Sequence, residues 1–177
     1  MIDRRTLLEA MAGLLLAPAA LARAQTPPAA APLAPALAKA LAESSFVYVS
    51  PLLSNGEESR CHGEVWYGWI DDAVVIITAT KSWKSRSLIV RRLNRARIWV
   101  GDYGRVKKMM GTNEAFRAGP SFEARTEVVR SAQMIERLLS IYDKKYPAEI
   151  KNWRGPMRAG LADGSRLMLR YVPDART

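Results

Sequence analysis

Cysteine and histidine are the scarcest residues of this chain, with one of each, Cys61 and His62, among 177 residues. A single cysteine excludes an intramolecular disulfide, so the core must hold the fold together. Neighbouring residues of a strand point to opposite faces, so this pair does not form a Cys/His metal site, and we predict no metal. The sequence also lacks a Ser-His-Asp arrangement, a paired-carboxylate motif, a Walker loop and a GxGxxG motif. These absences leave no direct indication of a catalytic residue.

Acidic residues are also few, because 17 Asp and Glu stand against 27 Lys and Arg, for a net charge of +10. Such a charge suits nucleic acid, an anionic membrane surface or acidic small molecules. The 49% hydrophobic and 25% charged content is typical of an ordinary globular chain, and this length usually makes one domain.

Long hydrophobic runs are missing too, since the apolar stretch from Met11 to Leu21 is too short to span a bilayer comfortably. Paired arginines, Arg4 and Arg5, precede it. The small-x-small pattern Ala22-Arg23-Ala24 follows it and predicts cleavage after Ala24. The arginine pair with the two leucines after it indicates a twin-arginine signal, which exports folded proteins; the alternative is an ordinary secretory signal that contains two arginines.

We therefore expect a signal peptide at residues 1–24 and a mature protein that is periplasmic or secreted, with no transmembrane segment after cleavage. The mature chain keeps 24 basic and 15 acidic residues, a net charge of +9. Export makes nucleic acid the least suitable partner. Residues 25–43 are expected to form a Pro/Ala-rich linker and a short helix, because Leu37 and Leu41 lie four residues apart. Residues 44–177 are expected to form the folded domain.

The folded part is expected to contain six strands, two principal helices and no βαβ alternation. Apolar alternation and turn residues predict strands at 46–50, 61–69, 74–80, 97–100, 122–128 and 166–172. The first three would form an antiparallel meander, with an Asn-Gly turn between the first two. Helices are expected at 83–93 and from Ser131 to Pro147, with a long loop at 102–120 and an irregular segment at 148–160. This predicts a mainly β (α+β) protein, a small six-stranded antiparallel β-barrel, closed or partly open, with flanking helices.

The junction at Thr78–Arg86 is the strongest candidate site. A β-branched strand pattern ends there, Ser82 is the natural N-cap of the next helix, and Lys84 and Arg86 add two positive charges. Free backbone N–H groups and these cations suit a phosphate. A solvated surface helix is the alternative interpretation. The hydroxyls of Thr78, Thr80 and Ser82 converge on the same junction, either for a ligand or for capping.

The segment Ser82–Leu88 resembles the S-x-K-x-R-x-L segment of the pyridoxamine 5'-phosphate oxidase-like split-barrel flavoproteins, and the resemblance extends from Ser45 to Tyr171. It implies that Lys84 and Arg86 hold the phosphate of flavin mononucleotide (FMN). It also implies that the flavin ring lies along residues 62–67, often across the interface of a homodimer, where Gly63 would let a flat ring approach the backbone. The expected cofactor-binding residues are Thr78, Thr80, Ser82, Lys84, Arg86, His62, Gly63, Val65 and Trp66.

The chain departs from true pyridoxamine phosphate oxidases because it is short, carries an export signal and lacks a basic C-terminal segment. The vitamin B6 reaction is therefore not expected. The leading hypothesis is an exported flavin-dependent oxidoreductase with an unidentified redox substrate, since a flavin brings its own redox chemistry. The alternatives are a protein that binds a flavin, a deazaflavin or haem without turnover, and a barrel without cofactor that acts as an interaction module.

We predict that replacing Arg4 and Arg5 together with Lys leaves the protein in the cytoplasm without impairing its folding, because the twin-arginine route requires both guanidinium groups. Cell fractionation measures the location, and far-UV circular dichroism of the retained protein measures its folding. Normal periplasmic delivery of this variant would show that the pair is incidental.

Overall fold

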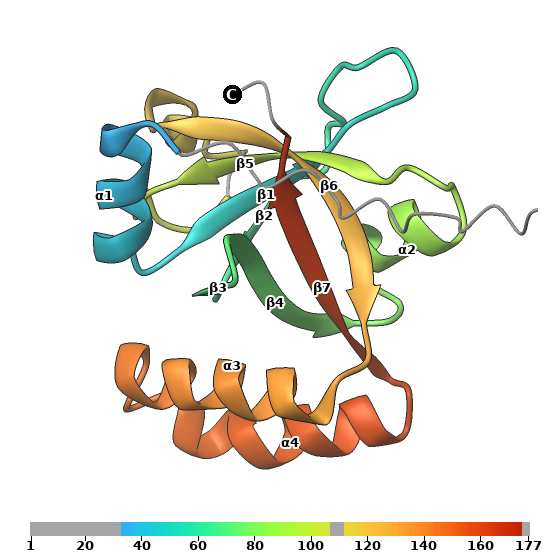
Figure 1. Cartoon of the computed structure of the whole chain (residues 1–177). Coiled ribbons are helices and arrows are strands. Elements are labelled where there is room, and N and C mark those ends of the chain that lie inside the picture. Colours follow the sequence, from blue (N-terminus) through green and yellow to red (C-terminus); the bar gives the residue numbers. More distant parts are fainter. Residues whose placement is uncertain (1–32, 107–111, 175–177) are drawn as a thin grey trace, which may run out of the picture.

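One curled antiparallel sheet with helices around it makes up the described part of the chain, residues 33–106 and 112–174 of a computed structural model (Figure 1). The seven strands of these residues are β1 (Val47–Pro51), β2 (Gly63–Val65), β3 (Gly68–Ile70), β4 (Ala73–Ala79), β5 (Arg95–Val100), β6 (Ser121–Val129) and β7 (Arg166–Pro173). The helices are α1 (Pro35–Glu43), α2 (Trp83–Ile89), α3 (Ala132–Lys145), α4 (Ile150–Ala162) and the short 3-10 helix η1 (Ala115–Ala118). No helix in the described ranges is long and apolar enough to cross a membrane.

The two edges of this sheet are consecutive in the sequence. The strand order is β2-β1-β5-β6-β7-β4-β3, with every neighbouring pair antiparallel, and only Trp66 and Tyr67 separate β2 from β3. The chain from Val65 to Gly68 spans at most about 11 Å. The sheet therefore curls until its edges meet, which gives the half-barrel visible in Figure 1.

This closure corrects the expected strand count. The prediction of one strand at 61–69 is wrong, because the chain leaves the sheet at Trp66 and Tyr67 and starts a new strand at the opposite edge. The sheet has seven strands instead of six, and the predicted three-stranded meander does not form. A period-two pattern cannot reveal such a break, since residues on both sides of it remain apolar and extended.

Two apolar layers bury both faces of β4. Val74 and Ile76 point into the barrel interior, whereas Val75 and Ile77 pack against α3 and α4. A strand that is covered on both faces needs apolar side chains at every position, which explains its unbroken β-branched run. The strands predicted around residues 46–50, 74–80, 97–100, 122–128 and 166–172 are confirmed within one or two residues at each end.

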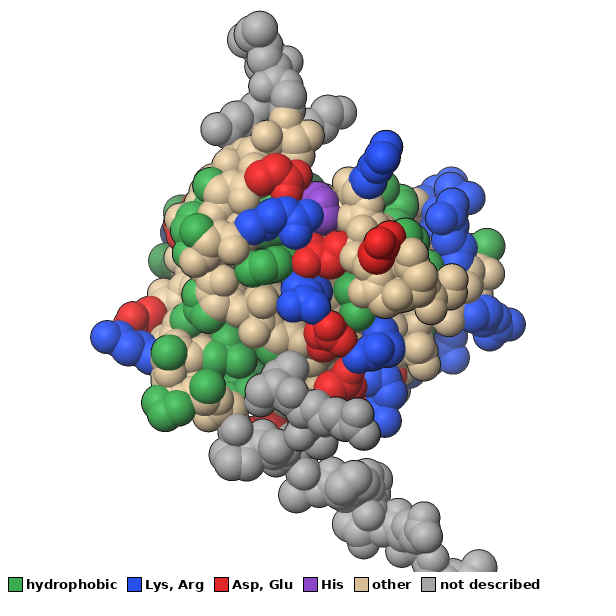
Figure 2. All heavy atoms as spheres, turned by 90° about the horizontal axis from the view of Figure 1, so that it is seen from above, with side chains coloured by type: hydrophobic (Ala, Val, Ile, Leu, Met, Phe, Trp, Pro, Cys, Tyr) green, Lys and Arg blue, Asp and Glu red, His purple; other side chains and the backbone are tan. Residues whose placement is uncertain are grey.

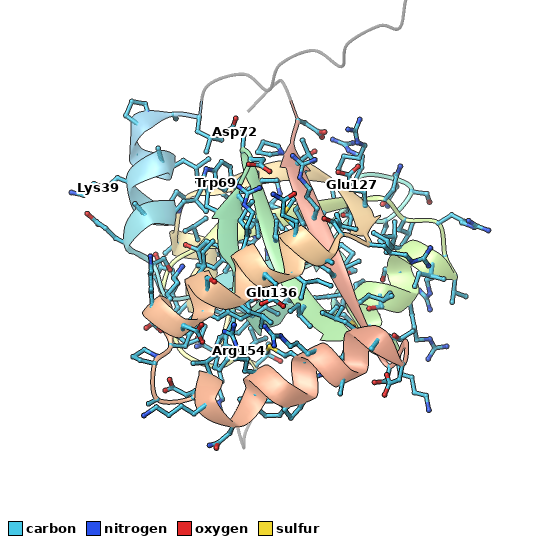
Figure 3. All side chains as sticks on the ribbon, turned by 60° about the horizontal axis from the view of Figure 1, so that its bottom comes forward. Lys39, Trp69, Asp72, Glu127, Glu136 and Arg154 are labelled. Carbon is cyan, nitrogen blue, oxygen red and sulfur yellow. The ribbon has the colours of Figure 1, made fainter. Side chains whose placement is uncertain are left out.

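The segment 148–160, predicted to be irregular, forms most of α4. Pro156 lies inside this helix, and Glu149 provides no side-chain cap, so local preferences oppose it. Packing compensates, because Ile150 and Met157 are buried with the side chains of α3. The two helices lie side by side under the sheet (Figure 1), and an ion pair of 3.6 Å joins Arg154 Nη2 of α4 to Glu136 Oε2 of α3 (Figure 3).

Helix α2 is shorter than predicted and ends at Ile89 instead of Leu93. The chain turns at Arg92, whose φ of 58° lies in the left-handed region, before β5 begins. The short helix expected from Leu37 and Leu41 is confirmed as α1, with both leucines buried. The 102–120 loop contains η1, while residues 107–111 lie outside the described part. The expected signal peptide and most of the linker also lie outside it.

An aromatic clamp of four residues, Trp66, Tyr67, Tyr142 and Tyr146, holds the junction between β2 and β3. The Tyr67 backbone N–H donates to the Tyr146 hydroxyl (3.1 Å), which in turn donates to the Ser45 carbonyl (2.6 Å). The Tyr142 hydroxyl donates to the Trp66 carbonyl (3.0 Å), and the Trp66 ring stacks on Tyr146 with centroids 4.4 Å apart. Helix α3 and its C-cap residue Tyr146 thus satisfy the backbone groups that the break in the strand leaves free.

We predict that Tyr146→Phe lowers the free energy of unfolding by about 1–3 kcal/mol, because it leaves the buried Tyr67 N–H without a partner. Chemical denaturation measures the change. The control is Tyr171→Phe, since Tyr171 is 1% exposed and its hydroxyl has no hydrogen-bond partner in the described residues. Equal losses in the two variants would show that the Tyr146 hydroxyl does not hold the closure.

Candidate functional site

The hydroxyl groups at the end of β4 bond to one another and to the backbone. Thr78 Oγ1 donates to Ser82 Oγ (3.0 Å), and Ser82 Oγ accepts from the Ser85 N–H (3.3 Å), which confirms Ser82 as the N-cap of α2. Ser85 Oγ donates to the Ala79 carbonyl (2.9 Å). Thr80 points elsewhere, since its Oγ1 donates to the Gly164 carbonyl before β7 (2.6 Å). Capping of α2 thus involves Thr78 and Ser82, whereas Thr80 bonds to the backbone just before β7.

Lys84 and Arg86 lie on different sides of α2. Residues two apart on a helix are separated by about 200° around its axis, so their side chains diverge. Lys84 reaches β2, whereas Arg86 lines a pocket on the outer side. The structure brings both cations to the predicted junction but does not bring them together.

The Lys84 ammonium occupies the space that Gly63 leaves by having no side chain. A Cβ at position 63 would lie only 2.5 Å from Lys84 Nζ. Lys84 forms no hydrogen bond or ion pair with the described residues, and burial lowers its pKa below the ordinary value. Burial removes much of the water around this cation, and no described residue replaces that water as a partner. The site therefore favours an anionic or electron-rich ligand.

The outer pocket next to α2 has a volume of about 200 Å³ and is basic. Its lining residues are Lys81, Trp83, Arg86, Ser87, Val90 and Arg91. The three cations make no ion pair with the described residues, and no acidic side chain lines the pocket. Trp83, Ser87 and Val90 follow the i, i+4, i+7 rhythm of one helix face. The sequence singled out Arg86 but missed Lys81 and Arg91, which join it only once the chain folds around α2.

His62 is held as a neutral ring. Its Nδ1 lies 2.7 Å from Ser50 Oγ, and Arg117 Nη2 lies 3.2 Å from its Nε2. A guanidinium group only donates, so Nε2 accepts and the proton resides on Nδ1. Burial lowers the pKa of His62, and Arg117 acts in the same direction, while Glu114 and Glu58 oppose them. Both ring nitrogens are therefore occupied by protein partners.

The remaining predicted cofactor ligands near β2 point to different sides of the strand, because neighbouring residues alternate between its two faces. Gly63 and Val65 face the barrel interior, where Val65 packs against the core, while His62 lies on the other side. Trp66 belongs to the aromatic clamp. Of the predicted ring-binding residues, the structure thus places Gly63 next to a predicted phosphate ligand, Lys84, and directs His62 and Trp66 elsewhere.

Two further ionisable groups have unusual surroundings. Glu64 Oε2 is buried without a hydrogen-bond partner in the described residues, and burial, helped by Asp102, raises the pKa of Glu64 against the effect of Arg105. Lys145 Nζ lies 3.4 Å from the centre of the Tyr67 ring, and burial lowers its pKa to about 8. No sequence signal marked Lys145, because its ring partner comes from a distant strand junction. Among the described residues, no group of three or more His, Cys, Asp or Glu is arranged to hold a metal ion.

Comparison with known proteins identifies the fold of this chain. No protein-family model matches the sequence, and no curated protein matches it significantly. Solved structures do match. HutZ, the heme storage protein from Vibrio cholerae, has a TM-score of 0.51 at 12% identity, over 80% of this chain and 90% of HutZ. The chain has the split-barrel fold.

Two more solved structures show the same architecture. The conserved hypothetical protein Rv2991 from Mycobacterium tuberculosis has a TM-score of 0.53 at 20% identity, covering 82% of this chain and 83% of that one. ChuZ from Campylobacter jejuni has a TM-score of 0.50 at 11% identity, over 78% of this chain and 51% of ChuZ. Identities this low show the fold alone, so the ligand of this split barrel must be argued from its own residues.

We predict that the neutral state of His62 makes stability depend on pH. Because the folded pKa lies below the unfolded value of about 6.5, the unfolded chain binds more protons in this range, and the free energy of unfolding falls as the pH drops from about 7 towards 5. Denaturation at several pH values should show a weaker pH dependence for His62→Gln than for the unchanged protein. NMR titration of this single histidine gives the pKa directly, and a value above 6.5 would contradict the neutral assignment.

Proposed function

We propose that this split barrel is an exported FMN-binding protein and that it acts as a flavin-dependent oxidoreductase. The observation that carries the proposal is the pair of unsatisfied basic features on the two sides of α2. The pocket on one side contains three cations without ion pairs among the described residues, and the Lys84 ammonium lies over Gly63 on the other side. Phosphate is a suitable ligand for the pocket, because Arg and Lys form strong charge-assisted hydrogen bonds with it.

The residues fit different parts of the cofactor. Arg86, with Lys81 and Arg91, would hold the phosphate, and Ser87 adds a hydroxyl to the same pocket. Lys84 would face the ring side along β2, where its positive charge favours an electron-rich group. Bound FMN would supply the electron transfer, while the protein would supply position and electrostatics. The assignment of Lys84 to the phosphate, which the resemblance implies, becomes the less favoured one in this arrangement.

The size of the pocket supports a shared site. Its volume of about 200 Å³ is below the roughly 300–1,000 Å³ typical of sites that enclose a whole ligand of this size. It accommodates the phosphate end and leaves the flavin ring to other surfaces. We propose that a second copy of the chain completes the site, as a homodimer would.

Haem is the second candidate, because HutZ is a heme storage protein with the same fold. The occupancy of His62 weighs against haem ligation by histidine. Both nitrogens of the only imidazole in the chain are hydrogen-bonded inside the protein, so ligation would require breaking one of these contacts. A flavin or deazaflavin needs no such ligand. The absorbance spectrum of the purified protein separates the candidates, since flavin bands and a Soret band differ.

We propose that the protein reaches the periplasm through the twin-arginine route. That route carries folded proteins, so a cofactor inserted in the cytoplasm would be retained during export. A non-catalytic flavin carrier is the alternative to an enzyme, and turnover with an electron donor distinguishes the two.

We predict that Arg86→Ala weakens FMN binding roughly ten- to a hundredfold, because a charge-assisted hydrogen bond to phosphate contributes about 1.5–3 kcal/mol. Riboflavin, which lacks the phosphate, should lose little. Lys84→Ala should weaken both ligands, since its side chain lies over β2. Isothermal titration or quenching of flavin fluorescence measures the affinities.

The matched control for this measurement is Lys39→Ala. It removes an exposed cation that has no ion pair among the described residues and lies on α1, away from α2 (Figure 1). It should leave both affinities nearly unchanged. Equal losses of FMN and riboflavin in Arg86→Ala would contradict the phosphate assignment. Light scattering of the FMN-bound protein tests the shared site, and a monomer with FMN bound would contradict it.

A further inference from the structure

The tip of α2 exposes two adjacent aliphatic side chains. Ile89 is 43% exposed and Val90 is 66% exposed. Among the described residues, only one other large hydrophobic side chain is this exposed, Trp153 of α4. Trp153 is a single residue, and the Arg166 guanidinium covers its ring at 5.5 Å. The pair on α2 has no such cover, so it forms a small apolar protrusion.

Cations surround this protrusion. Lys81, Arg86, Arg91 and Arg92 flank it, and none of them forms an ion pair with the described residues. Arginines elsewhere in the fold commonly face an acid: Arg137 pairs with Asp71, Arg97 with Glu58 and Arg170 with Glu127. Figure 2 shows Lys and Arg side chains gathered along the right-hand edge, the side that carries α2 in Figure 1. We call the four cations together with Trp83, Ile89 and Val90 the α2 patch.

We propose that the α2 patch docks onto a lipid bilayer surface that contains anionic headgroups. The patch matches the two layers of such a surface, because aliphatic side chains gain by entering the acyl boundary while cations remain at the phosphates. Trp83 adds an aromatic side chain of the kind enriched at membrane interfaces. Nucleic acid matches the charge but offers no counterpart for two exposed aliphatic groups.

This inference goes beyond the proposed cofactor site, because it concerns how the protein is positioned. Lys81, Arg86 and Arg91 are shared with the pocket, so bound FMN would neutralise part of their charge. Ile89 and Arg92 belong to the patch but do not line the pocket. Substituting these two residues therefore separates docking from cofactor binding. Arg92 is replaced by Asn, since Asn tolerates the left-handed backbone at this position.

The first experiment places an environment-sensitive fluorophore on Ile89→Cys in a Cys61→Ser background, so that the chain carries one thiol. Phosphatidylcholine vesicles with roughly one third phosphatidylglycerol are added. The fluorescence should shift to shorter wavelength and increase as the label enters the bilayer boundary. A label on Lys39→Cys of α1 should not respond. No response at position 89, or equal responses at both positions, would overturn the proposal.

The second experiment measures vesicle binding by sedimentation at about 0.15 M salt, where charges farther than about 8 Å apart are largely screened. Ile89→Ser combined with Arg92→Asn should lower the partition coefficient at least about tenfold, because one interfacial cation alone accounts for about fivefold. Lys39→Gln and Trp153→Ser are the controls for charge and exposed apolar area, and each should change binding less than about twofold. FMN affinity should be unchanged in all of these variants.

Three other results would overturn the proposal. Equal losses in Lys39→Gln and in the α2 double variant would show that binding follows net charge alone. A concentration-dependent dimer without vesicles that Ile89→Ser abolishes would show that the α2 patch is covered by a second copy of this chain. Vesicle binding of the double variant that equals that of the parent would contradict the docking proposal. If Arg86→Ala loses FMN affinity in the same set of experiments, the cofactor proposal is retained.

Discussion

The two-residue link between β2 and β3 is the constraint on which the rest of this structure depends. Trp66 and Tyr67 connect opposite edges of a seven-stranded sheet, so the sheet must curl to satisfy the chain length. Leaving the sheet frees backbone groups that cannot remain unpaired in the interior. Tyr142 of α3 and Tyr146 at the C-cap of this helix supply partners for them, which ties the helical layer to the closure. The same curl brings β2 next to α2, so that Lys84 lies over Gly63.

Helix α2 separates two basic environments that the linear motif places two residues apart. Its inner side presents Lys84 to the edge strand, and its outer side presents Arg86 to the pocket. The cap of the helix is satisfied internally by Ser82 and Thr78. Ligand binding at this junction would therefore rest on side-chain charge more than on the free N–H groups of a seven-residue helix.

The charges of this protein are distributed unevenly over its surface. Near β5 and η1, Arg97 and Arg117 both contact Glu58, and Arg117 also donates to His62. Such contacts neutralise that region, while burial, with a smaller effect of Arg117, lowers the pKa of His62. The cations around α2 have no acidic neighbours of this kind in the described part of the chain. The unpaired cations around α2 therefore form a local concentration of positive charge that favours anions.

Local patterns in the sequence were sufficient to predict most of the strands and the N-cap of α2. The β-branched run at 74–77 indicates a strand buried on two faces, and the alternation at 122–128 indicates a strand buried on one face. Ser82 is a cap because its side chain accepts a hydrogen bond from the N–H three residues ahead. These features depend on neighbours within a few residues, so a single sequence contains them. The order of such elements indicated a small antiparallel barrel, and the resemblance of Ser82–Leu88 indicated a split barrel, although the strand count proved to be seven.

Tertiary structure decided what depends on distant partners. Helix α4 forms despite Pro156 because its apolar side is buried against α3, and the strand at 61–69 breaks because its halves pair with β1 and β4 at opposite edges. The candidate site shows the same division. The sequence identified Lys84 and Arg86 as the important cations, but only the packing of α2 between the pocket and β2 sent them to different sides. A sequence states which charges are available, whereas the direction of each side chain and the solvent it loses are set by elements far along the chain.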